Sequence, residues 1–371
     1  MKLFEFEGKD LFREEGIPVP EGTAAYSVSD AVSTAARIGY PVAVKSQVLT
    51  GSRGKRGGIK LARNEKEVLA FAGRFLKEGF GAETVGCILV EKQVDIKAEY
   101  YMAVVPDSVE GRAVLMATPE GGIDVESVSH TIVSESIDVS RGLQPYQVRK
   151  VIKPWGLNEE QIKKVVAIAL KMYALFLKFD GELVEINPLV QTGAGDIIAL
   201  DAKIIINDNA LYRQPRYQKT RERFDHDLEF KAAQHNLNYV KLDGNIGVLC
   251  TGAGLTLATL DLISMIGGKA ANFLESGGGN YQNAFNGLNL VLSDPDVKVL
   301  LINTFGLVSR ADVICEGLVK VLKEMHSEIP VVASIRGTGQ EQARQLFVDE
   351  LGIEPFTDTE AAVREAVRLA G

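Results

Sequence analysis

The sequence predicts an α/β protein with more than one domain, and three observations lead to this prediction. The chain has 371 residues, about two and a half times a common domain length of about 150. Apolar residues make up 46% of it and charged residues 24%, which is enough to fill folded cores and excludes wholesale disorder. From about Asp243 onward, short apolar strands alternate with helices that begin after glycine-rich turns. This alternation is typical of a parallel, doubly wound sheet.

The first part of the chain is predicted to mix helices with antiparallel strands. We expect a short helix that ends at Gly16, a second helix over SVSDAVSTAARIG and a strand over PVAVKSQV. Asn64 and Glu67 have the spacing of a capping box, so a third helix begins there. Short polar turns join the next three β-rich segments, which are CILVEKQV, AEYYMAVVPD and GRAVLMATP. Their spacing predicts that all three belong to one antiparallel sheet.

A long amphipathic helix and a hairpin follow. Asn158 and Gln161 fit another helix cap, and apolar side chains then recur every three or four residues as far as Phe176. The helix is expected to end at Phe179. The hairpin consists of GELVEINPLV, a turn at TGAGD, and IIALDAKIII.

The second part of the chain is predicted to contain four buried strands, which are IGVLC, ANFLE, VKVLLINTF and PVVASI. The polar stretch 212–238 forms the connection, so we expect one domain over residues 1–238 and another over 239–371. Glycine-rich turns follow three of the strands, at Gly252–Gly254, Ser276–Gly279 and Gly306–Ser309. Such turns would meet in one crevice, where open α/β sheets bind ligands. Each turn taken alone is equally compatible with a purely structural role.

Charge and cysteine content exclude several classes of function. Lys and Arg number 41 against 49 Asp and Glu, a formal net charge of −8, so we expect neither nucleic acid nor an anionic membrane as a partner. The three cysteines are far apart and lack CxxC spacing, which argues against a disulfide framework or a zinc site and indicates a reducing compartment. The acidic N-terminus does not resemble a targeting peptide, so we expect a cytoplasmic protein. The four histidines have no metal-ligand spacing, and no nucleophile stands out.

A glycine-rich basic loop, Gly51–Gly58, is a candidate phosphate-binding site. Its glycines allow the backbone to approach a polyanion, and Arg53, Lys55 and Arg56 supply positive charge. It is not a Walker A loop, because GK[ST] and an immediately following helix are both missing. Lys45, on the preceding strand, would reach the same phosphates. The alternative is a basic turn that only faces solvent, and the loop by itself favours neither interpretation.

The hairpin is a candidate magnesium site. Glu185 and Asn187 are two residues apart and therefore share one face of a strand. If the turn centres on Ala194, Asn187 lies opposite Asp201. Oxygen ligands on adjacent strands suit Mg²⁺, which takes one or two protein ligands together with phosphates and water. A hairpin with one solvated face is the alternative.

Ordered motifs along almost the whole chain carry a family resemblance. They are LFEFEGKDLFREEGIPVP, GSRGKRGG, ILVEKQVDIKAEYY, ELVEINPLV with LDAK, DNALYRQP, LNYVKLDGNIG, GAGLTLATLD, NFLESGGG and LINTFGLVSRAD. The chain thereby resembles the β subunit of succinyl-CoA synthetase, and the family includes relatives such as malate–CoA ligase. The resemblance implies an N-terminal ATP-grasp domain and a C-terminal flavodoxin-like domain. It also implies the reaction acid + CoA + ATP → acyl-CoA + ADP + phosphate, with Mg²⁺. A partner α subunit would carry CoA and a phosphohistidine, in an αβ heterodimer or an α2β2 heterotetramer.

The resemblance assigns roles to individual residues of this chain. The residues that it places on the nucleotide phosphates are Lys45, Ser52, Arg53 and Gly54, and those that it places at the base and ribose are Glu91, Val94 and Glu99. Asn187 and Asp201 match the Mg²⁺ ligands, and Glu185 matches a carboxylate that faces the phosphohistidine. The residues that it places at the acid are Thr251, Leu307, Val308 and Ser309. Pro20 matches the position where ATP-using members carry proline.

The departures from the family pattern cluster at the acid site. Thr251 stands where the family has asparagine, and FGLVSR from Phe305 to Arg310 stands where the family has FGGIVR. Ser52 also replaces a glycine. Succinate is therefore the family default, and another carboxylic acid is an open alternative. Two further alternatives are an ATP-grasp ligase with a different acceptor and a non-catalytic regulatory β-like subunit.

Overall fold

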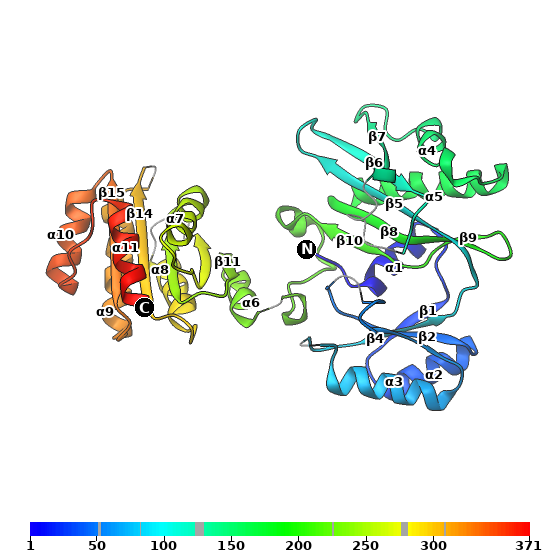
Figure 1. The fold of residues 1–371 in the computed structure, drawn as a ribbon, viewed down its shortest axis with the longest axis horizontal. Helices are drawn as coiled ribbons and strands as arrows, with labels where there is room; N and C mark the ends of the chain where they lie inside the picture. Colours follow the sequence, from blue (N-terminus) through cyan, green and yellow to red (C-terminus); the bar gives the residue numbers. More distant parts are fainter. Residues whose placement is uncertain (51–52, 82, 123–129, 225, 276–280, 308) are drawn as a thin grey trace. The chain divides into compact units, whose positions relative to one another are not determined.

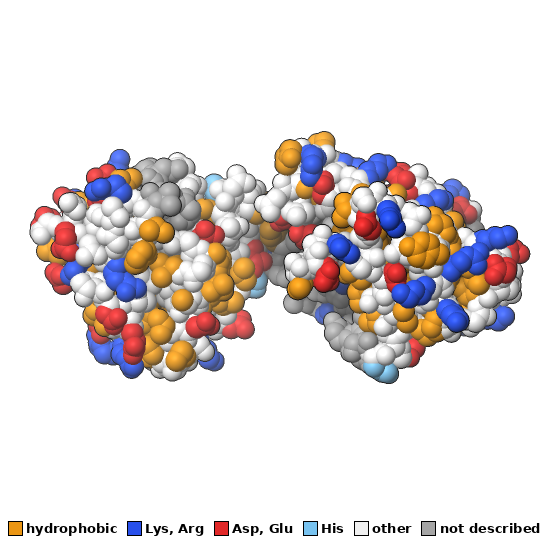
Figure 2. Space-filling model, turned by 90° about the horizontal axis from the view of Figure 1, so that it is seen from above, with side chains coloured by type: hydrophobic (Ala, Val, Ile, Leu, Met, Phe, Trp, Pro, Cys, Tyr) orange, Lys and Arg blue, Asp and Glu red, His pale blue; other side chains and the backbone are white. Residues whose placement is uncertain are grey.

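The computed structural model describes residues 1–50, 53–81, 83–122, 130–224, 226–275, 281–307 and 309–371. The chain divides into two compact units, Met1–Gln218 and Lys219–Gly371. Within the described part of the chain, no helix has the length and apolar character needed to cross a membrane. On the face drawn in Figure 2, basic and acidic side chains are interspersed over the surface.

The first unit contains a small antiparallel sheet in the order β1-β4-β2-β3. Its strands are β1 (Gly22–Ala25), β2 (Val42–Ser46), β3 (Ile59–Ala62) and β4 (Ile88–Lys92). The helices α2 (Val28–Ile38) and α3 (Glu65–Glu78) cover one face, where they share a core with Val44 and Val90. Because side chains alternate along a strand, Lys45 and Glu91 project from the opposite face.

The first unit also contains a larger antiparallel sheet in the order β10-β8-β5-β6-β7, with β9 paired to β8. Its strands are β5 (Ile96–Asp107), β6 (Arg112–Thr118), β7 (Val133–Ile137), β8 (Gly181–Thr192), β9 (Ile197–Ala199) and β10 (Lys203–Ile206). The helices α4 (Pro145–Val151) and α5 (Glu159–Lys178) pack on this sheet in one core with Met102 and Val104. As predicted, Asn158 caps α5 by accepting the Gln161 N–H at 2.9 Å.

The prediction that β4, β5 and β6 belong to one sheet is wrong. β4 pairs with β1 and β2, whereas β5 and β6 pair with each other in the larger sheet. The physical reason is the core that each strand joins. Val90 of β4 packs under α2 and α3, whereas Met102 of β5 packs under α5. The chain therefore changes sheets at 93–95.

The helix α1 (Glu5–Glu14) lies between these two sheets (Figure 1). Leu11 and Phe12 are fully buried in the core of the larger sheet, and the Leu3 N–H donates to the Ile204 carbonyl at 2.9 Å. A Cβ at Gly8 would approach the Ala202 Cβ to 3.0 Å, so glycine permits the close contact between helix and hairpin. The helix is thus fixed to the hairpin while its other face meets the small sheet.

The second unit is built on a sheet in the order β11-β13-β12-β14-β15. The four predicted strands are β12 (Ile246–Cys250), β13 (Asn272–Glu275), β14 (Val299–Gly306) and β15 (Val331–Gly337), and they pair in parallel. The helices that cover one face are α7 (Ala253–Met265) and α11 (Thr359–Ala370). Those that cover the other face are α8 (Tyr281–Leu292), α9 (Ala311–Met325) and α10 (Gln340–Leu351). The predicted doubly wound sheet is confirmed.

The sequence did not predict the edge strand β11 (Asn238–Lys241), which pairs antiparallel with β13. The helix α6 (Asp227–Gln234) precedes it, and Ala232 and Leu237 join the core of the second unit. The helix α6 and Leu237 therefore pack with the second unit.

Candidate functional site

A cluster of six charged residues lies between the two sheets of the first unit. Its members are Glu5 and Lys9 of α1, Lys45 of β2, Glu91 of β4, Arg53 and Asp201. Arg53 belongs to the turn that follows β2, and Asp201 lies between β9 and β10. Segments far apart in the sequence thus contribute opposite charges to one place.

Lys45 is held from two sides by carboxylates. Its Nζ lies 2.8 Å from Glu5 Oε1 and 2.5 Å from Glu91 Oε1, and it donates to the Leu200 carbonyl at 3.1 Å. Burial alone would lower the pKa of Lys45, but the two carboxylates raise it above its ordinary value. The ammonium group therefore stays charged although the side chain is buried.

Arg53 extends the same cluster toward the hairpin. Its Nη2 lies 2.9 Å from Glu5 Oε2 and 3.6 Å from Asp201 Oδ1, and its Nη1 donates to the Ser46 carbonyl at 2.9 Å. Burial alone would raise the pKa of Glu5, but the three cations around this carboxylate hold its pKa well below the ordinary value. Glu5 is thus an anion that two candidate phosphate-binding cations share.

The hairpin has the register predicted from a turn centred on Ala194. Leu189 pairs with Ala199 on one side, and Glu185 pairs with Lys203 on the other. Asn187 and Asp201 occupy the matching positions between these pairs. Asn187 Oδ1 accepts the Gly122 N–H at 2.7 Å, and burial with the nearby Glu5 charge raises the pKa of Asp201.

The donor set at this hairpin fits Mg²⁺ better than a transition metal. Asn187 and Asp201 offer one amide oxygen and one carboxylate, both hard ligands. Among the described residues, no group of three or more His, Cys, Asp and Glu side chains is placed to hold a metal ion. A cation here would therefore need further oxygens from phosphate and water, as Mg²⁺ usually does.

Glu185 lies on the same strand β8, between β5 and β10. It pairs with Ala103 on one side and Lys203 on the other. The Tyr101 hydroxyl donates to Glu185 Oε2 at 3.4 Å, and Lys203 Nζ is 4.0 Å away. The period of the strand places this carboxylate on the same face as Asn187.

The residues predicted to line a base pocket lie on three successive parts of the chain, which are β4, the segment after it and β5. Glu91 is fully buried in the charged cluster, where it also pairs with Lys9. Val94 is half-buried in the segment where the chain changes sheets. Glu99 is half-buried on β5, and burial raises the pKa of its carboxyl group.

Two hydrogen bonds close the described part of the predicted phosphate loop into a compact turn. The Gly57 N–H donates to the Gly54 carbonyl at 3.2 Å, and the Gly58 N–H donates to the Arg53 carbonyl at 2.8 Å. Ser52 lies outside the described residues.

The turns after β12 and β14 lie side by side in the second unit. Cys250 is in register with Asn303, and Thr251 Oγ1 accepts the Phe305 N–H at 3.1 Å. Leu307 is 74% exposed, and Ser309 is also exposed. Val308 and the turn at Ser276–Gly279 lie outside the described residues. Two of the three predicted turns are thus neighbours at the carboxyl edge of the sheet.

Sequence reasoning missed Glu5 and Lys9, although a signal was present. Glu5, Gly8, Lys9 and Phe12 have the i, i+3, i+4, i+7 spacing of one helical face. The stripe contains an apolar residue that enters the core, so charged residues on it had to be buried and paired.

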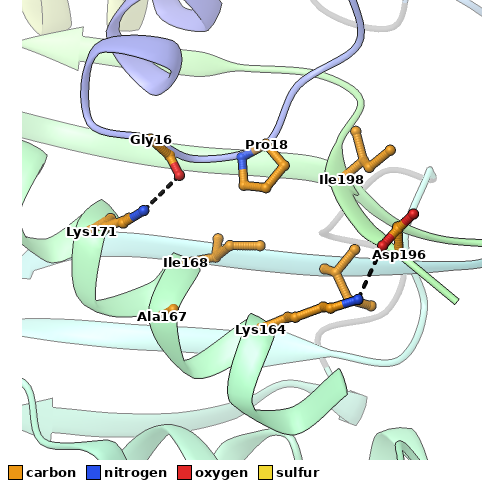
Figure 3. Close-up of a pocket in the computed structure, with 9 residues that line it drawn as sticks. Gly16, Pro18, Lys164, Ala167, Ile168, Lys171, Asp196 and Ile198 are labelled. Atoms are coloured by element: carbon orange, nitrogen blue, oxygen red, sulfur yellow. Dashed lines mark hydrogen bonds and ion pairs between the residues drawn. The ribbon is translucent and has the colours of Figure 1, made fainter. Parts of the chain in front are cut away.

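A separate groove of about 420 Å³ lies on the first unit, between α5, the segment around Pro18 and the β8–β9 hairpin (Figure 3). Lys171 donates to the Gly16 carbonyl at 2.6 Å, and Lys164 lies 3.0 Å from Asp196 Oδ1. Its lining contains none of the residues predicted for the site.

Comparison with known proteins identifies two domains in order. A family model described as ATP-grasp domain matches residues 2–191, and one described as CoA-ligase matches residues 249–369. The chain is 41% identical over 375 residues to the ADP-forming sulfoacetate-CoA ligase subunit SauC of Bilophila wadsworthia, and the alignment covers 100% of this chain and 99% of that one. It is 38% identical over 385 residues to the succinate–CoA ligase [ADP-forming] subunit beta of Persephonella marina, with the same coverage.

Among solved structures, ATP citrate lyase from Methanothrix soehngenii matches with a TM-score of 0.76 and 19% identity, over 99% of each chain. This likeness supports the fold. Together with the two family models, it confirms the predicted order of an ATP-grasp domain and a CoA-ligase domain.

The buried position of Lys45 generates a stability prediction. Lys45→Met removes the cation that Glu5 and Glu91 share, so it should lower the free energy of unfolding by about 3–5 kcal/mol. Arg74→Met is the matched control, because Arg74 pairs with Glu78 on the solvent-exposed surface of α3. Urea denaturation measures both variants. Equal stability of Lys45→Met and the wild type would contradict the burial of this charge cluster.

Proposed function

Because this chain belongs to the family of β subunits of ADP-forming acid–CoA ligases, we propose that its first unit binds ATP and supplies the nucleotide half of acyl-CoA formation. The reaction is acid + CoA + ATP → acyl-CoA + ADP + phosphate. One observation carries this proposal: a single carboxylate holds Lys45 and Arg53 together, next to a hairpin with hard oxygen ligands. Fixed cations of this kind stabilise the charge of a phosphoryl group during transfer.

Asn187 and Asp201 are the residues that would hold Mg²⁺. When bound, the ion would neutralise phosphate charge and orient the nucleotide. The spacing of the two side chains across the hairpin supports this assignment, and so does the contact between Arg53 and Asp201.

The base and ribose are assigned to the segment where the chain passes from the small sheet to the large one. Val94 lies in this segment, with Glu91 before it and Glu99 after it. Because the side chain of Glu91 is fully buried in the charged cluster, Glu91 would then contribute to the base and ribose site through the charged residues that it contacts. Ser52 and Gly54 would complete the phosphate loop, and Pro20 supports ATP over GTP.

The phosphoryl group is proposed to leave this chain on a histidine of a partner α subunit that also holds CoA. Both relatives described above are subunits of ligases, which supports a shared active site. Glu185 would face the incoming neutral imidazole and accept a hydrogen bond from one ring N–H. This contact would orient the ring so that its other, unprotonated nitrogen accepts the phosphoryl group, and it would stabilise the positive charge that develops on the ring. The assembly would be an αβ heterodimer or an α2β2 heterotetramer.

The acid is proposed to bind at the turns after β12 and β14, through Thr251 and the residues Leu307, Val308 and Ser309. The Thr251 hydroxyl already accepts a backbone N–H, and Leu307 adds a branched side chain. Both features disfavour the contacts that a family member with asparagine and glycine would offer to succinate. Sulfoacetate, the substrate named for the Bilophila relative, is therefore our first candidate. A branched or less polar acid is the second.

The division of labour between subunits is tested by comparing the lone chain with its complex. The lone chain should bind ATP–Mg²⁺ but make no acyl-CoA, whereas the complex with the α partner should make acyl-CoA in an ATP-dependent reaction. Calorimetry and a coupled ADP assay over a panel of acids measure the two properties. Steady-state turnover by a rigorously purified lone chain would refute the two-subunit proposal.

The metal assignment predicts that Asp201→Asn weakens Mg²⁺-dependent nucleotide binding while the hairpin stays folded. The loss should be at least about tenfold, because even groups behind metal ligands contribute that much. Asp196→Asn, in the same hairpin but paired with Lys164, is the control and should leave the affinity unchanged. If Asp201→Asn binds nucleotide like the wild type, the metal lies elsewhere.

The acid assignment predicts that succinate is a poor substrate of the wild-type complex. The double variant Thr251→Asn with Leu307→Gly should raise kcat/KM for succinate relative to the native acid. The expected change is roughly 5- to 150-fold, because an unsatisfied buried polar group costs about 1–3 kcal/mol. The measurement is kcat/KM for succinate, sulfoacetate and branched acids. A wild-type complex that prefers succinate over the whole panel would overturn the assignment.

A further inference from the structure

Glu5 and Lys9 of α1 are buried charged residues that the proposed function places neither on the nucleotide nor on the metal ion. Glu5 is 2% exposed and Lys9 is 0% exposed. Neither side chain is placed to touch a large ligand from solvent. A charge in such a position is costly unless it is paired, so its partners indicate what it does.

The two residues form a ring of alternating charges together with Lys45 and Glu91. Glu5 Oε1 lies 2.8 Å from both Lys9 Nζ and Lys45 Nζ. Glu91 contacts the same two ammonium groups, Lys45 through Oε1 at 2.5 Å and Lys9 through Oε2. Lys45 therefore has a carboxylate on each side, and Lys9 holds both carboxylates in place.

The second oxygen of Glu5 fixes Arg53, since Oε2 lies 2.9 Å from Arg53 Nη2. One carboxylate thus sets the separation of the two proposed phosphate-binding cations. Glu5 in turn belongs to a helix that is anchored on the metal-binding hairpin through Gly8, which packs against Ala202 next to Asp201. The ring consequently relates the cations of the small sheet to the hairpin of the large sheet.

We propose that Glu5 and Lys9 are positioning residues for phosphoryl transfer, which act by holding Lys45 and Arg53 in fixed places relative to Asn187 and Asp201. The proposal rests on the proposed nucleotide function of those residues. Its physical basis is that proteins catalyse phosphoryl transfer almost entirely by positioning and electrostatic stabilisation, and a misplacement of about 1 Å can lower the rate about a hundredfold.

Net charge offers a competing explanation, and the two make opposite predictions. The cluster contains three cations and three carboxylates, so removal of the Glu5 charge leaves it more positive. A more positive site attracts a polyanion more strongly. If charge alone mattered, Glu5→Gln would bind ATP at least as tightly and transfer its phosphoryl group at least as fast. If position matters, binding persists but transfer slows.

The experiment uses the complex of this chain with its α partner and three variants, Glu5→Gln, Lys9→Met and the double variant. Calorimetry gives the Kd for ATP–Mg²⁺, and a single-turnover assay gives the rate of phosphorylation of the partner subunit. We expect each single variant to lower this rate about 10- to 100-fold, with Kd for Glu5→Gln unchanged or lower. The double variant restores the balance of charge but not the ion pairs by which Glu5 and Lys9 hold Lys45 and Arg53 in place, so its rate should stay low. A return to the wild-type rate in the double variant would overturn the proposal.

Asp294→Asn is the control that distinguishes a positioning role from a contribution to stability alone. Asp294 is also a buried carboxylate, 3.0 Å from Lys241, but it belongs to the second unit and to none of the proposed sites. We expect this variant to lower the Tm while the rate of the folded complex stays at the wild-type value. A Glu5→Gln complex that shows the same pattern, with a lower Tm and an unchanged rate, would refute the positioning role.

Glu5→Asp keeps the test decisive if Glu5→Gln does not fold. This variant preserves the charge and shortens the side chain by one carbon, so the carboxylate that holds Lys45 and Arg53 moves without a change in net charge. We expect a slower transfer with the wild-type Kd, and a wild-type rate would overturn the proposal. A wild-type complex that binds no ATP–Mg²⁺ would instead refute the proposed function itself, which distinguishes the two failures.

Discussion

The cost of burying charge organises the first unit. Glu5 and Lys45 are both removed from water and pair with each other. Lys9 compensates Glu5 and Glu91, and Glu91 compensates Lys45. These four side chains come from α1, β2 and β4, so the ion ring forms only when the helix and the small sheet are both folded and adjacent. The same ion pairs keep Lys45 protonated although it is buried, as its proposed role in phosphate binding requires.

The larger sheet contributes the other half of this site through one hairpin. The two-residue period of β8 puts Glu185 and Asn187 on one face, and the register of the hairpin brings Asp201 level with Asn187. Arg53 approaches Asp201 from the small sheet. Cations and hard oxygen ligands therefore occur together, an arrangement that suits a nucleotide with its magnesium ion.

In the second unit, the strands β12 to β15 are parallel, so the turns that follow them lie at one edge of the sheet. Thr251 and Phe305 are joined there by a hydrogen bond between a side chain and the backbone. The threonine hydroxyl thus supports the turn itself. For the acid that is proposed to bind at this edge, this is a physical reason to expect a difference from the family default.

The sequence alone determined the features that depend on local periodicity and short-range chemistry. It predicted the helix caps at Asn64 and Asn158 and the hairpin register around Ala194 from short spacings, and the four parallel strands from the alternation of apolar segments with helices. Only the tertiary structure decided which sheet β4 joins, that β11 adds an antiparallel edge, and that Glu5 and Lys9 are paired inside. These outcomes depend on contacts between segments distant in the sequence, such as the 82 positions from Lys9 to Glu91. No local pattern encodes such a contact, although the burial of a charged helical stripe required that some partner exist.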